Sequence, residues 1–270
     1  MKMVKKEFEE YRRKIEERLE ILLPPAGMEP RVLHRAMRYS VLSGGKRLRP
    51  VIVLASGDIA GVDHEKLMPA ACGLEILHNF SLVHDDLPAM DNDDYRRGKL
   101  TCHKKFGEDV AILAGDALLT LAFEAISETG LVSLVKAVAR ATGSLGMAGG
   151  QVLDMKFKDR KVPGHMKKKI DVLKTGCLFK VCFEAPLHFR KVSEKDSRTI
   201  SRLADNFGQA FQVRDDIEDN EGDASSMKKK LEILYGEMKR DICSFGERGK
   251  LLGYINERLF NVTAAGMKNH

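Results

Sequence analysis

Aspartates gather in one short stretch of the chain, and this density is the first sign of chemistry. Five of them lie within ten residues and two arginines follow shortly: Asp85, Asp86, Asp91, Asp93, Asp94, Arg96 and Arg97. Carboxylates this close repel one another and are costly to bury unpaired. A bound cation is the simplest remedy, and hard oxygen ligands without a nearby cysteine favour Mg²⁺ over Zn²⁺. Arginines beside such a site indicate a phosphate-bearing ligand, because a guanidinium can bind two phosphate oxygens.

A second acidic cluster lies much later in the chain, in the segment Phe211–Asp219. Asp215 and Asp219 are four residues apart, so they share one face of a helix, and Asp216 lies beside them. Either cluster alone could be a solvated acidic patch. Two clusters that each follow an apolar helical run and each begin with Asp-Asp favour metal binding instead.

The spacing of the first cluster does not suit one straight helix. Asp85 and Asp91 are six residues apart, which is about 600° of helical rotation. Pro88 also removes a backbone donor and disrupts a helix. We therefore expect the cluster to close a helix, with the chain bending to bring Asp91 back. Carboxylates are unfavourable at a helix C-terminus, which again indicates a cation.

Three further features carry basic or titratable side chains. Gly44–Pro50 is a glycine-led basic turn whose Lys46 and Arg49 can neutralise phosphate, although an ordinary basic helix start explains it equally well. His78 lies on an apolar helix, where a satisfied core histidine is the commoner role. Lys174–Gly176 is similarly ambiguous, since its lysine can snorkel or bind an anion.

Apolar residues at helical spacing predict an all-α protein, and no strand or hairpin pattern is evident. We expect helices over residues 3–23, 30–43, 48–60, 65–86, 107–128, 131–157, 168–186, 195–219, 225–242 and 246–260. No internal repeat and no long linker divides them. The sequence therefore predicts one α-helical domain, residues 1–270, built on a bundle.

Composition narrows the function. The chain has 270 residues, 43% of them hydrophobic, and a net charge of +6. No nucleic-acid motif accompanies the positive charge, so we expect no nucleic-acid binding, and small anionic substrates fit the local clusters better. The five scattered cysteines indicate reduced core thiols rather than zinc ligands. We expect no apolar run of the length of a membrane span, and the N-terminus is charged, which predicts a cytoplasmic protein without stable membrane insertion.

The chain resembles the trans-isoprenyl diphosphate synthases, most closely the bacterial farnesyl diphosphate synthases. The segments that carry the resemblance occur in the family's order: GGKRLRP (44–50), EILHNFSLVHDDLPAMDNDDYRRGKLTCHKKFGEDVAILAGDALL (75–119), GGQVLDM (149–155), KTG (174–176) and FQVRDDIED (211–219). The two aspartate-rich motifs together are the most specific of these.

The resemblance implies a fold and a reaction. The fold is an isoprenoid-synthase-type helical bundle around a deep central cavity, in a polyprenyl synthetase domain that forms homodimers. The reaction joins isopentenyl diphosphate to an allylic diphosphate, dimethylallyl or geranyl, with three Mg²⁺ ions at the site. The expected product is a short-chain prenyl diphosphate.

The resemblance also assigns residues by motif. The implied metal ligands are Asp85, Asp86, Asp91, Asp215, Asp216 and Asp219. The implied isopentenyl diphosphate ligands are Lys46, Arg49, His78 and Arg97. The implied allylic diphosphate ligands are Arg96, Lys174, Thr175 and Gln212. The residues expected to carry catalysis are Asp85, Asp86, Asp91, Arg96, Lys174 and Asp215. Phe80, with Ser81 beside it, is implied as the floor of the prenyl pocket, which favours farnesyl diphosphate over geranylgeranyl diphosphate, although a core role suits Phe80 equally well from sequence alone.

The sequence departs from the family in two places. Glu218 replaces a usual leucine, and Asp223–Met227 runs directly into a lysine-rich helix where the family has a lysine-bearing loop. Either the loop is absent or the sequence omits a segment there, and we expect omission. The alternatives are a class I terpene cyclase, which has no second diphosphate site, and a non-catalytic regulatory subunit, which the missing loop would favour.

Overall fold

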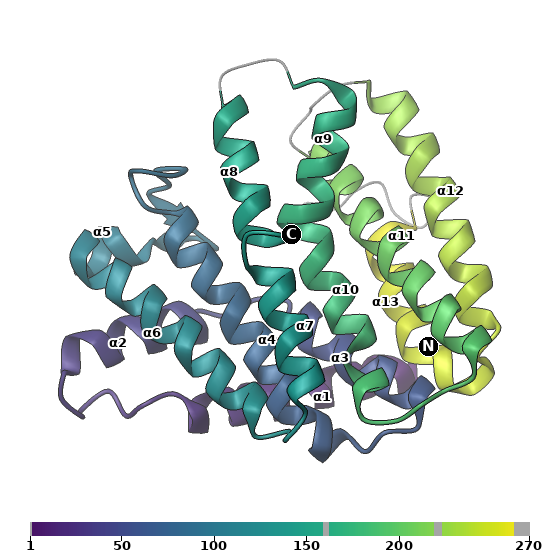
Figure 1. Ribbon diagram of the computed structural model, residues 1–270, viewed down its shortest axis with the longest axis horizontal. Coiled ribbons are helices and arrows are strands. Elements are labelled where there is room, and N and C mark those ends of the chain that lie inside the picture. The colour runs from purple at the N-terminus through teal and green to yellow at the C-terminus, as the bar shows by residue number, and fades with distance from the viewer. Residues whose placement is uncertain (1, 159–161, 219–222, 262–270) are drawn as a thin grey trace. The chain divides into compact units, whose positions relative to one another are not determined.

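The computed structural model describes residues 2–158, 162–218 and 223–261, and it confirms the all-α prediction (Figure 1). The helices are α1 (Lys2–Leu22), α2 (Arg31–Leu42), α3 (Leu48–Ala60), α4 (His64–Asp85), α5 (Cys102–Phe106), α6 (Glu108–Ser127), α7 (Val132–Thr142), α8 (Met147–Phe157), α9 (Gly164–Asp171), α10 (Cys177–Glu184), α11 (Glu194–Glu218), α12 (Ala224–Cys243) and α13 (Lys250–Phe260). Shorter helical segments are η1 (Val172–Gly176), η2 (Ala185–His188) and η3 (Gly246–Gly249).

The helices belong to two compact units. Unit 1 comprises Met1–Phe8, Ala55–Asp63 and Lys136–His270, and unit 2 comprises Glu9–Leu54 and His64–Val135. The first aspartate-rich motif therefore lies in unit 2 and the second in unit 1. The single domain expected from the sequence, residues 1–270, stays a prediction.

Unit 2 is built around the long helices α4 and α6, which pack against each other. The backbones approach closely at Gly73. A Cβ there would lie 2.5 Å from Ile126 Cγ1 and 2.8 Å from the Ala122 carbonyl oxygen. Because backbone atoms cannot yield as a flexible side chain can, only glycine fits this crossing without moving α6.

Gly73→Ala is expected to destabilise the protein by about 1–3 kcal/mol, the usual cost of overpacking a helix contact. Gly236 on α12 is the matched control, because a Cβ there would meet nothing within 4 Å. Gly236→Ala should stabilise the protein by about 0.4–1 kcal/mol through reduced entropy of the unfolded chain. Urea unfolding of the two variants measures both changes in the free energy of unfolding. Changes of the same sign would contradict the packing argument.

One element of unit 2 contradicts the expectation that no hairpin exists. Two-residue strands, β1 (Tyr95–Arg96) and β2 (Lys99–Leu100), pair antiparallel in register Tyr95–Leu100 and Arg96–Lys99. The turn residues Arg97 and Gly98 have φ of 53° and 73°, as two-residue hairpin turns require. The strands are too short to show an alternating pattern, which explains why the sequence did not reveal them.

Two predicted helices of unit 1 are interrupted. The helix expected over 131–157 is divided between α7 and α8. The backbone around the break leaves room only for glycine, since a Cβ at Gly146 would lie 2.0 Å from the Ala141 carbonyl oxygen and one at Gly149 would lie 2.1 Å from that of Ser144. The helix expected over 168–186 begins earlier, at Gly164, and its middle is η1, a π-helix. Such local π segments are frequent at functional sites.

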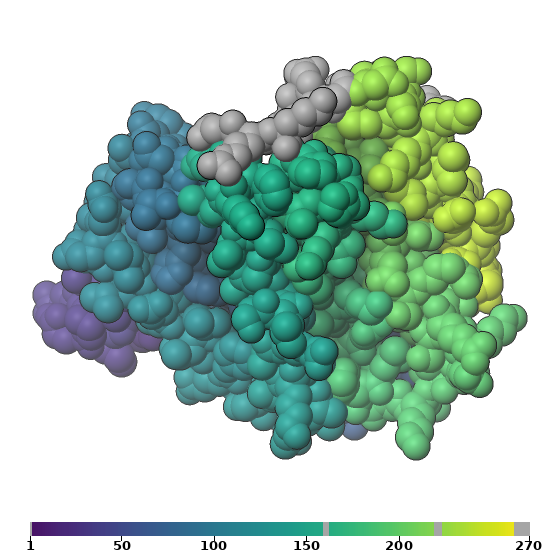
Figure 2. All heavy atoms as spheres, turned by 45° about the horizontal axis from the view of Figure 1, so that its top comes forward, coloured from purple at the N-terminus to yellow at the C-terminus, as the bar shows by residue number. Residues whose placement is uncertain are grey.

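Unit 1 has an aromatic core between α10, α11 and α13. The rings of Phe179 and Phe207 are 5.1 Å apart, and those of Phe207 and Phe260 are 5.0 Å apart. Helix α12 packs against α11 and α13, and its yellow-green atoms lie at the surface in Figure 2. Asp223 caps α12 by accepting hydrogen bonds from the backbone N–H groups of Ser225 and Ser226. Residues 223–227 are thus a capped helix start, and the omitted segment expected there stays a prediction.

Two expectations from composition need correction. Cys72, Cys102 and Cys182 are buried reduced thiols as expected, but Cys177 is only half-buried and Cys243 is exposed. Burial raises the pKa of the Cys72 thiol to about 12, which makes it unreactive.

Among the described residues one helix, Glu108–Ser127, is long and apolar enough to cross a membrane by length and composition, with a mean hydropathy of 1.7. Core helices of globular proteins meet the same criterion.

Candidate active site

The first aspartate-rich motif closes a helix, as its spacing predicted. Helix α4 ends at Asp85, and the chain then turns through Leu87–Met90. The Asp91 N–H donates a 2.8 Å hydrogen bond to the Asp85 carbonyl oxygen. This backbone bond brings Asp91 back to the helix end despite its unfavourable angular spacing.

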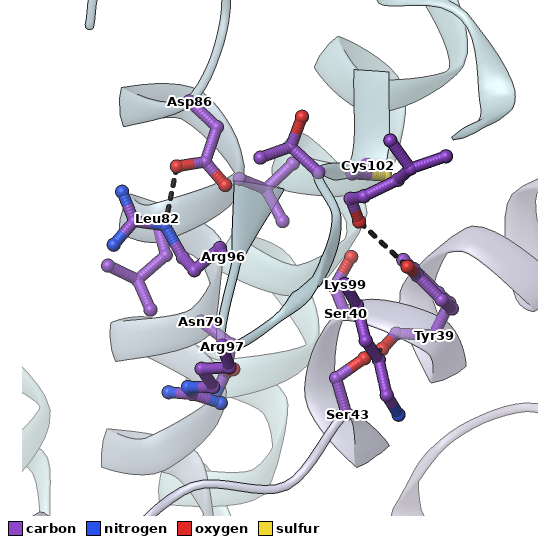
Figure 3. A pocket seen from close by; sticks show the side chains of 13 residues that line it. Tyr39, Ser40, Ser43, Asn79, Leu82, Asp86, Arg96, Arg97, Lys99 and Cys102 are labelled. Carbon is purple, nitrogen blue, oxygen red and sulfur yellow. Dashed lines mark hydrogen bonds and ion pairs between the residues drawn. The ribbon is translucent and has the colours of Figure 1, made fainter. Parts of the chain in front are cut away.

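Part of the negative charge of this motif is balanced by the protein itself. Arg96 on β1 donates from Nε to Asp86 at 2.5 Å (Figure 3). It also donates from Nη2 to Asp93 at 2.9 Å. Lys104 forms a 2.8 Å ion pair with Asp94. Asp86 is buried, and this burial raises the pKa of its carboxyl even though Arg96 acts in the opposite direction. Arg96, expected to bind the allylic diphosphate, thus also contacts an expected metal ligand.

His78 lies one and a half to two turns before this motif on α4, among several arginines. Burial lowers its pKa well below the ordinary value, and the positive charges of Arg49, Arg97 and Arg96 lower it further. His78 is therefore neutral at pH 7. Unit 2 brings together three of the four residues expected to bind isopentenyl diphosphate. The fourth, Lys46, is exposed on the same basic turn as Arg49.

The β1–β2 hairpin contacts the basic turn Gly44–Pro50 through Arg97. The Arg97 guanidinium donates from Nη1 to the Gly44 carbonyl oxygen, and a Cβ at Gly45 would lie 2.9 Å from the same Nη1. Gly45 has a φ of 136°, a backbone conformation that favours glycine. Desolvation lowers the pKa of Arg97, while the negative charge of Glu75 raises it.

A small cavity of about 40 Å³ lies beside this arrangement (Figure 3). It is lined by residues from α2, α4 and the hairpin, including Asp86, Arg96 and Arg97. Tyr39 donates a 2.7 Å hydrogen bond to the Leu100 carbonyl oxygen at its rim. A cavity of this size holds water molecules, not a diphosphate with its prenyl tail. The deep central cavity implied by the resemblance stays a prediction.

The second aspartate-rich motif lies at the end of α11 in unit 1. The Asp216 carboxylate accepts a 3.0 Å hydrogen bond from Gln212, one turn earlier, and forms a 3.2 Å ion pair with Lys167 on α9. Asp216 is buried and Asp215 is half-buried. Asp219, the remaining expected ligand, lies outside the described residues. Glu218, the departure from the family pattern, is exposed and forms a 2.7 Å ion pair with Arg214.

The π-helix η1 positions Lys174 and Thr175. The Lys174 Nζ lies 2.6 Å from Asp154 Oδ2 on α8. The backbones of α8 and η1 approach closely at Gly150, where a Cβ would lie 2.4 Å from the backbone nitrogen of Lys174. Burial raises the pKa of the nearby Asp171 to about 6, with Asp216 adding to the shift and Lys167 opposing it.

Sequence reasoning missed several residues at this site. Asp154 lies in a segment that supported the resemblance, but it received no role there. Lys167 and Asp171 lie outside every motif. Asp154 pairs with Lys174, 20 positions away in sequence, and Lys167 pairs with Asp216, 49 positions away. No local spacing could therefore have revealed these pairs.

The residues expected to limit the prenyl chain lie on α4 before the first motif. Phe80 is half-buried, and its ring lies 5.0 Å from that of His84 in an edge arrangement. The His84 ring packs directly over Gly115 of α6, where a Cβ would lie 2.1 Å from its Nε2. Ser81 is buried and donates a 2.9 Å hydrogen bond to the His78 carbonyl oxygen.

The donors of both motifs suit Mg²⁺ in type, since they are hard carboxylate oxygens without a cysteine among them. In the described part of the chain, no three or more His, Cys, Asp or Glu side chains form a group that could hold a metal. Asp86 and Asp216 instead have basic partners. Arg96 and Lys167 contact the Oδ1 atoms of these carboxylates, so a cation at either one would have a basic side chain beside it.

Comparison with known proteins agrees with this geometry. The polyprenyl synthetase family profile matches residues 30–238. A dimethylallyltranstransferase of Fischerella ambigua is 45% identical over 70% of this chain and 57% of its own length. A farnesyl diphosphate synthase of Micrococcus luteus is 43% identical over 73% of this chain and 69% of its own. The solved geranyltransferase of Legionella pneumophila superposes with a TM-score of 0.92 at 33% identity, covering 98% of this chain and 99% of its own.

The fold and the order of the motifs are those of the isoprenoid synthases. The chain belongs to the polyprenyl synthetase family of trans-isoprenyl diphosphate synthases. It spans about 57% of the length of the Fischerella ambigua relative that it matches.

Proposed function

We propose that this protein is a Mg²⁺-dependent prenyltransferase that condenses isopentenyl diphosphate with dimethylallyl or geranyl diphosphate to give farnesyl diphosphate. The observation that carries the proposal is the gathering of Arg49, Arg97 and neutral His78 in unit 2, beside the first aspartate-rich motif. Such a group binds a diphosphate next to carboxylates that suit Mg²⁺. Family membership and the printed names of its relatives support the same reaction.

The two diphosphates have separate sets of residues in this proposal. Lys46, Arg49 and Arg97 bind the isopentenyl diphosphate by charge, and neutral His78 donates one N–H without adding a further charge. Arg96, Lys174, Thr175 and Gln212 bind the allylic diphosphate. The six aspartates, Asp85, Asp86, Asp91, Asp215, Asp216 and Asp219, hold the metal.

The reaction begins when the C1–O bond of the allylic diphosphate breaks, with the electron pair leaving on the diphosphate. Bound Mg²⁺ would neutralise that leaving group. The double bond of isopentenyl diphosphate attacks the allylic cation, and loss of a proton completes the new unit. The contribution of Arg96 and Lys174 is to stabilise the departing charge and hold the allylic carbon in place.

We also propose that the protein is a cytoplasmic homodimer. On α6 of unit 2, Ile112 is 45% and Leu113 is 58% exposed. In a two-fold dimer each copy contributes the same surface, so a second copy would cover these two side chains.

One set of incubations tests the reaction. The protein is mixed with Mg²⁺, isopentenyl diphosphate and either dimethylallyl, geranyl or farnesyl diphosphate, and the products are separated by chain length. We expect C15 from the first two substrates. A C20 product identifies a geranylgeranyl synthase, hydrocarbon formed without isopentenyl diphosphate identifies a cyclase, and no product in any mixture contradicts the proposal and favours a regulatory subunit.

The two diphosphate sites are separable by substitution. Arg49→Ala should weaken binding of isopentenyl diphosphate, and Lys174→Ala binding of the allylic substrate, each by roughly ten- to hundredfold, because each variant removes a charge-assisted hydrogen bond. Calorimetric titration of each substrate alone measures the two affinities. Lys168→Ala, an exposed lysine on α9, is the control and should change neither. Equal losses for both substrates in both variants would reject the partition.

A further inference from the structure

Arg47 differs from its neighbours in the basic turn. Lys46 is exposed and Arg49 is half-buried, but Arg47 is only 1% exposed and is the largest fully buried side chain among the described residues. A buried guanidinium is costly unless its charge and its N–H groups are satisfied. Motif matching assigned no role to this arginine.

The Arg47 side chain is satisfied by two carboxylates and one carbonyl. Nε and Nη2 donate to the two Glu16 oxygens on α1, at 2.7 and 3.0 Å. Nη1 donates to Glu75 on α4 at 2.9 Å, and Nη2 also donates to the Val41 carbonyl oxygen at 2.7 Å. The paired contact with Glu16 is a two-point geometry that only arginine offers.

Hydrogen bonds also hold the backbone of the basic turn next to the Arg47 side chain. Arg47 has a φ of 49°, a left-handed conformation that a non-glycine residue adopts only under constraint. Its carbonyl oxygen accepts from the Val51 N–H at 3.3 Å and so begins α3. Arg97 donates to the Gly44 carbonyl oxygen, and Arg12 to that of Gly45 at 3.4 Å. Side chains of α1, α4 and the hairpin thus bind three residues of the turn, Gly44, Gly45 and Arg47.

We propose that Arg47, with Glu16 and Glu75, is the positioning residue of the isopentenyl diphosphate site. This inference rests on the proposed function. Ion pairs to half-buried Glu16 on α1 and to buried Glu75 on α4 hold the turn in its left-handed conformation, and this turn carries Lys46 and Arg49. Arg47 itself does not touch substrate, because its donors face Glu16, Glu75 and Val41.

The direction in which neutralising Glu16 changes the affinity for substrate distinguishes a positioning role from a purely electrostatic one. Glu16 is an anion of the same unit as the basic cluster. If it acted only through its electric field, its neutralisation would tighten binding of an anionic substrate. If it acts by holding Arg47, its neutralisation loosens the turn and weakens binding.

Glu16→Gln and Glu17→Gln form a matched pair. The residues are neighbours on α1 and the variants change net charge equally, but Glu17 pairs at the surface with Arg13 rather than with Arg47. Calorimetric titration with isopentenyl diphosphate should show a roughly tenfold higher Kd for Glu16→Gln, with Glu17→Gln unchanged or slightly tighter. Geranyl diphosphate should bind both variants as it binds the parent protein. In turnover assays, KM for isopentenyl diphosphate should rise for Glu16→Gln while kcat at saturation stays the same.

Arg47→Lys adds a second measurement. Lysine keeps the charge but cannot form the paired contact with Glu16, so it should behave like Glu16→Gln. If Arg47→Lys does not fold, the comparison of Glu16→Gln with Glu17→Gln is sufficient to test the inference. Equal Kd values for Glu16→Gln and Glu17→Gln, or tighter binding by Glu16→Gln, would overturn the inference. A parent protein that binds no isopentenyl diphosphate would overturn the proposed function itself, which is a distinct result.

Discussion

Asp85→Ala and Asp215→Ala are each expected to lower turnover by roughly a thousandfold or more, because a metal ligand supplies several kcal/mol of charge stabilisation to the leaving diphosphate. The fold should persist in both variants. Asp85 and Asp215 are half-buried, whereas the neighbouring Asp86 is buried and paired with Arg96 at 2.5 Å. Removing Asp86 would also take away one of the two carboxylates that pair with Arg96, so Asp85 is the cleaner probe.

The control for this experiment is Asp94→Asn in the same motif. Asp94 is 57% exposed at its side chain and pairs with Lys104, so its neutralisation should leave turnover near the parent value. Steady-state rates measured with Mg²⁺ and with excess EDTA, together with circular dichroism, complete the test. Near-normal turnover in Asp85→Ala or Asp215→Ala, or full activity in EDTA, would refute the metal assignment.

Phe80→Ala is expected to shift the product from C15 towards C20 or longer. The prenyl tail must extend through apolar space away from the metal ligands, and Phe80 lies on α4 five residues before Asp85. Its ring packs against His84, which in turn packs over Gly115. Removing the ring opens room for about one further isoprene unit. A stability loss towards the lower end of the usual 3–5 kcal/mol is expected, because Phe80 is not fully buried.

Phe80→Tyr separates volume from a general disturbance of α4. It keeps the ring and should keep the C15 product, while Phe80→Ala should not. Chromatography of the dephosphorylated products, with thermal unfolding of each variant, gives both readouts. If the parent protein already makes mainly C20, or if Phe80→Ala leaves the product spectrum unchanged, Phe80 is a core residue and not the floor of the pocket.

Both predictions depend on features that the sequence could reveal because they are local. Pro88 and the six-residue spacing of Asp85 and Asp91 correctly predicted a helix end and a returning chain. The apolar spacing of α4 and α11 correctly predicted the helices that carry the two motifs. Backbone geometry and helix termination act over a few residues, so these inferences needed no knowledge of distant partners.

Other features were decided only by the tertiary structure. The sequence could not show that Arg47 points inward while Lys46 is exposed, because Glu16 and Glu75 reach it from helices about 30 positions away. It could not show that Arg96 pairs with Asp86, since the hairpin that carries Arg96 has strands of only two residues. Ion pairs between distant residues depend on how helices pack and which charges are desolvated together. The sequence by itself therefore determined the family, most of the helices and the candidate motifs, whereas packing decided which basic side chains pair with which aspartates and which arginine is buried.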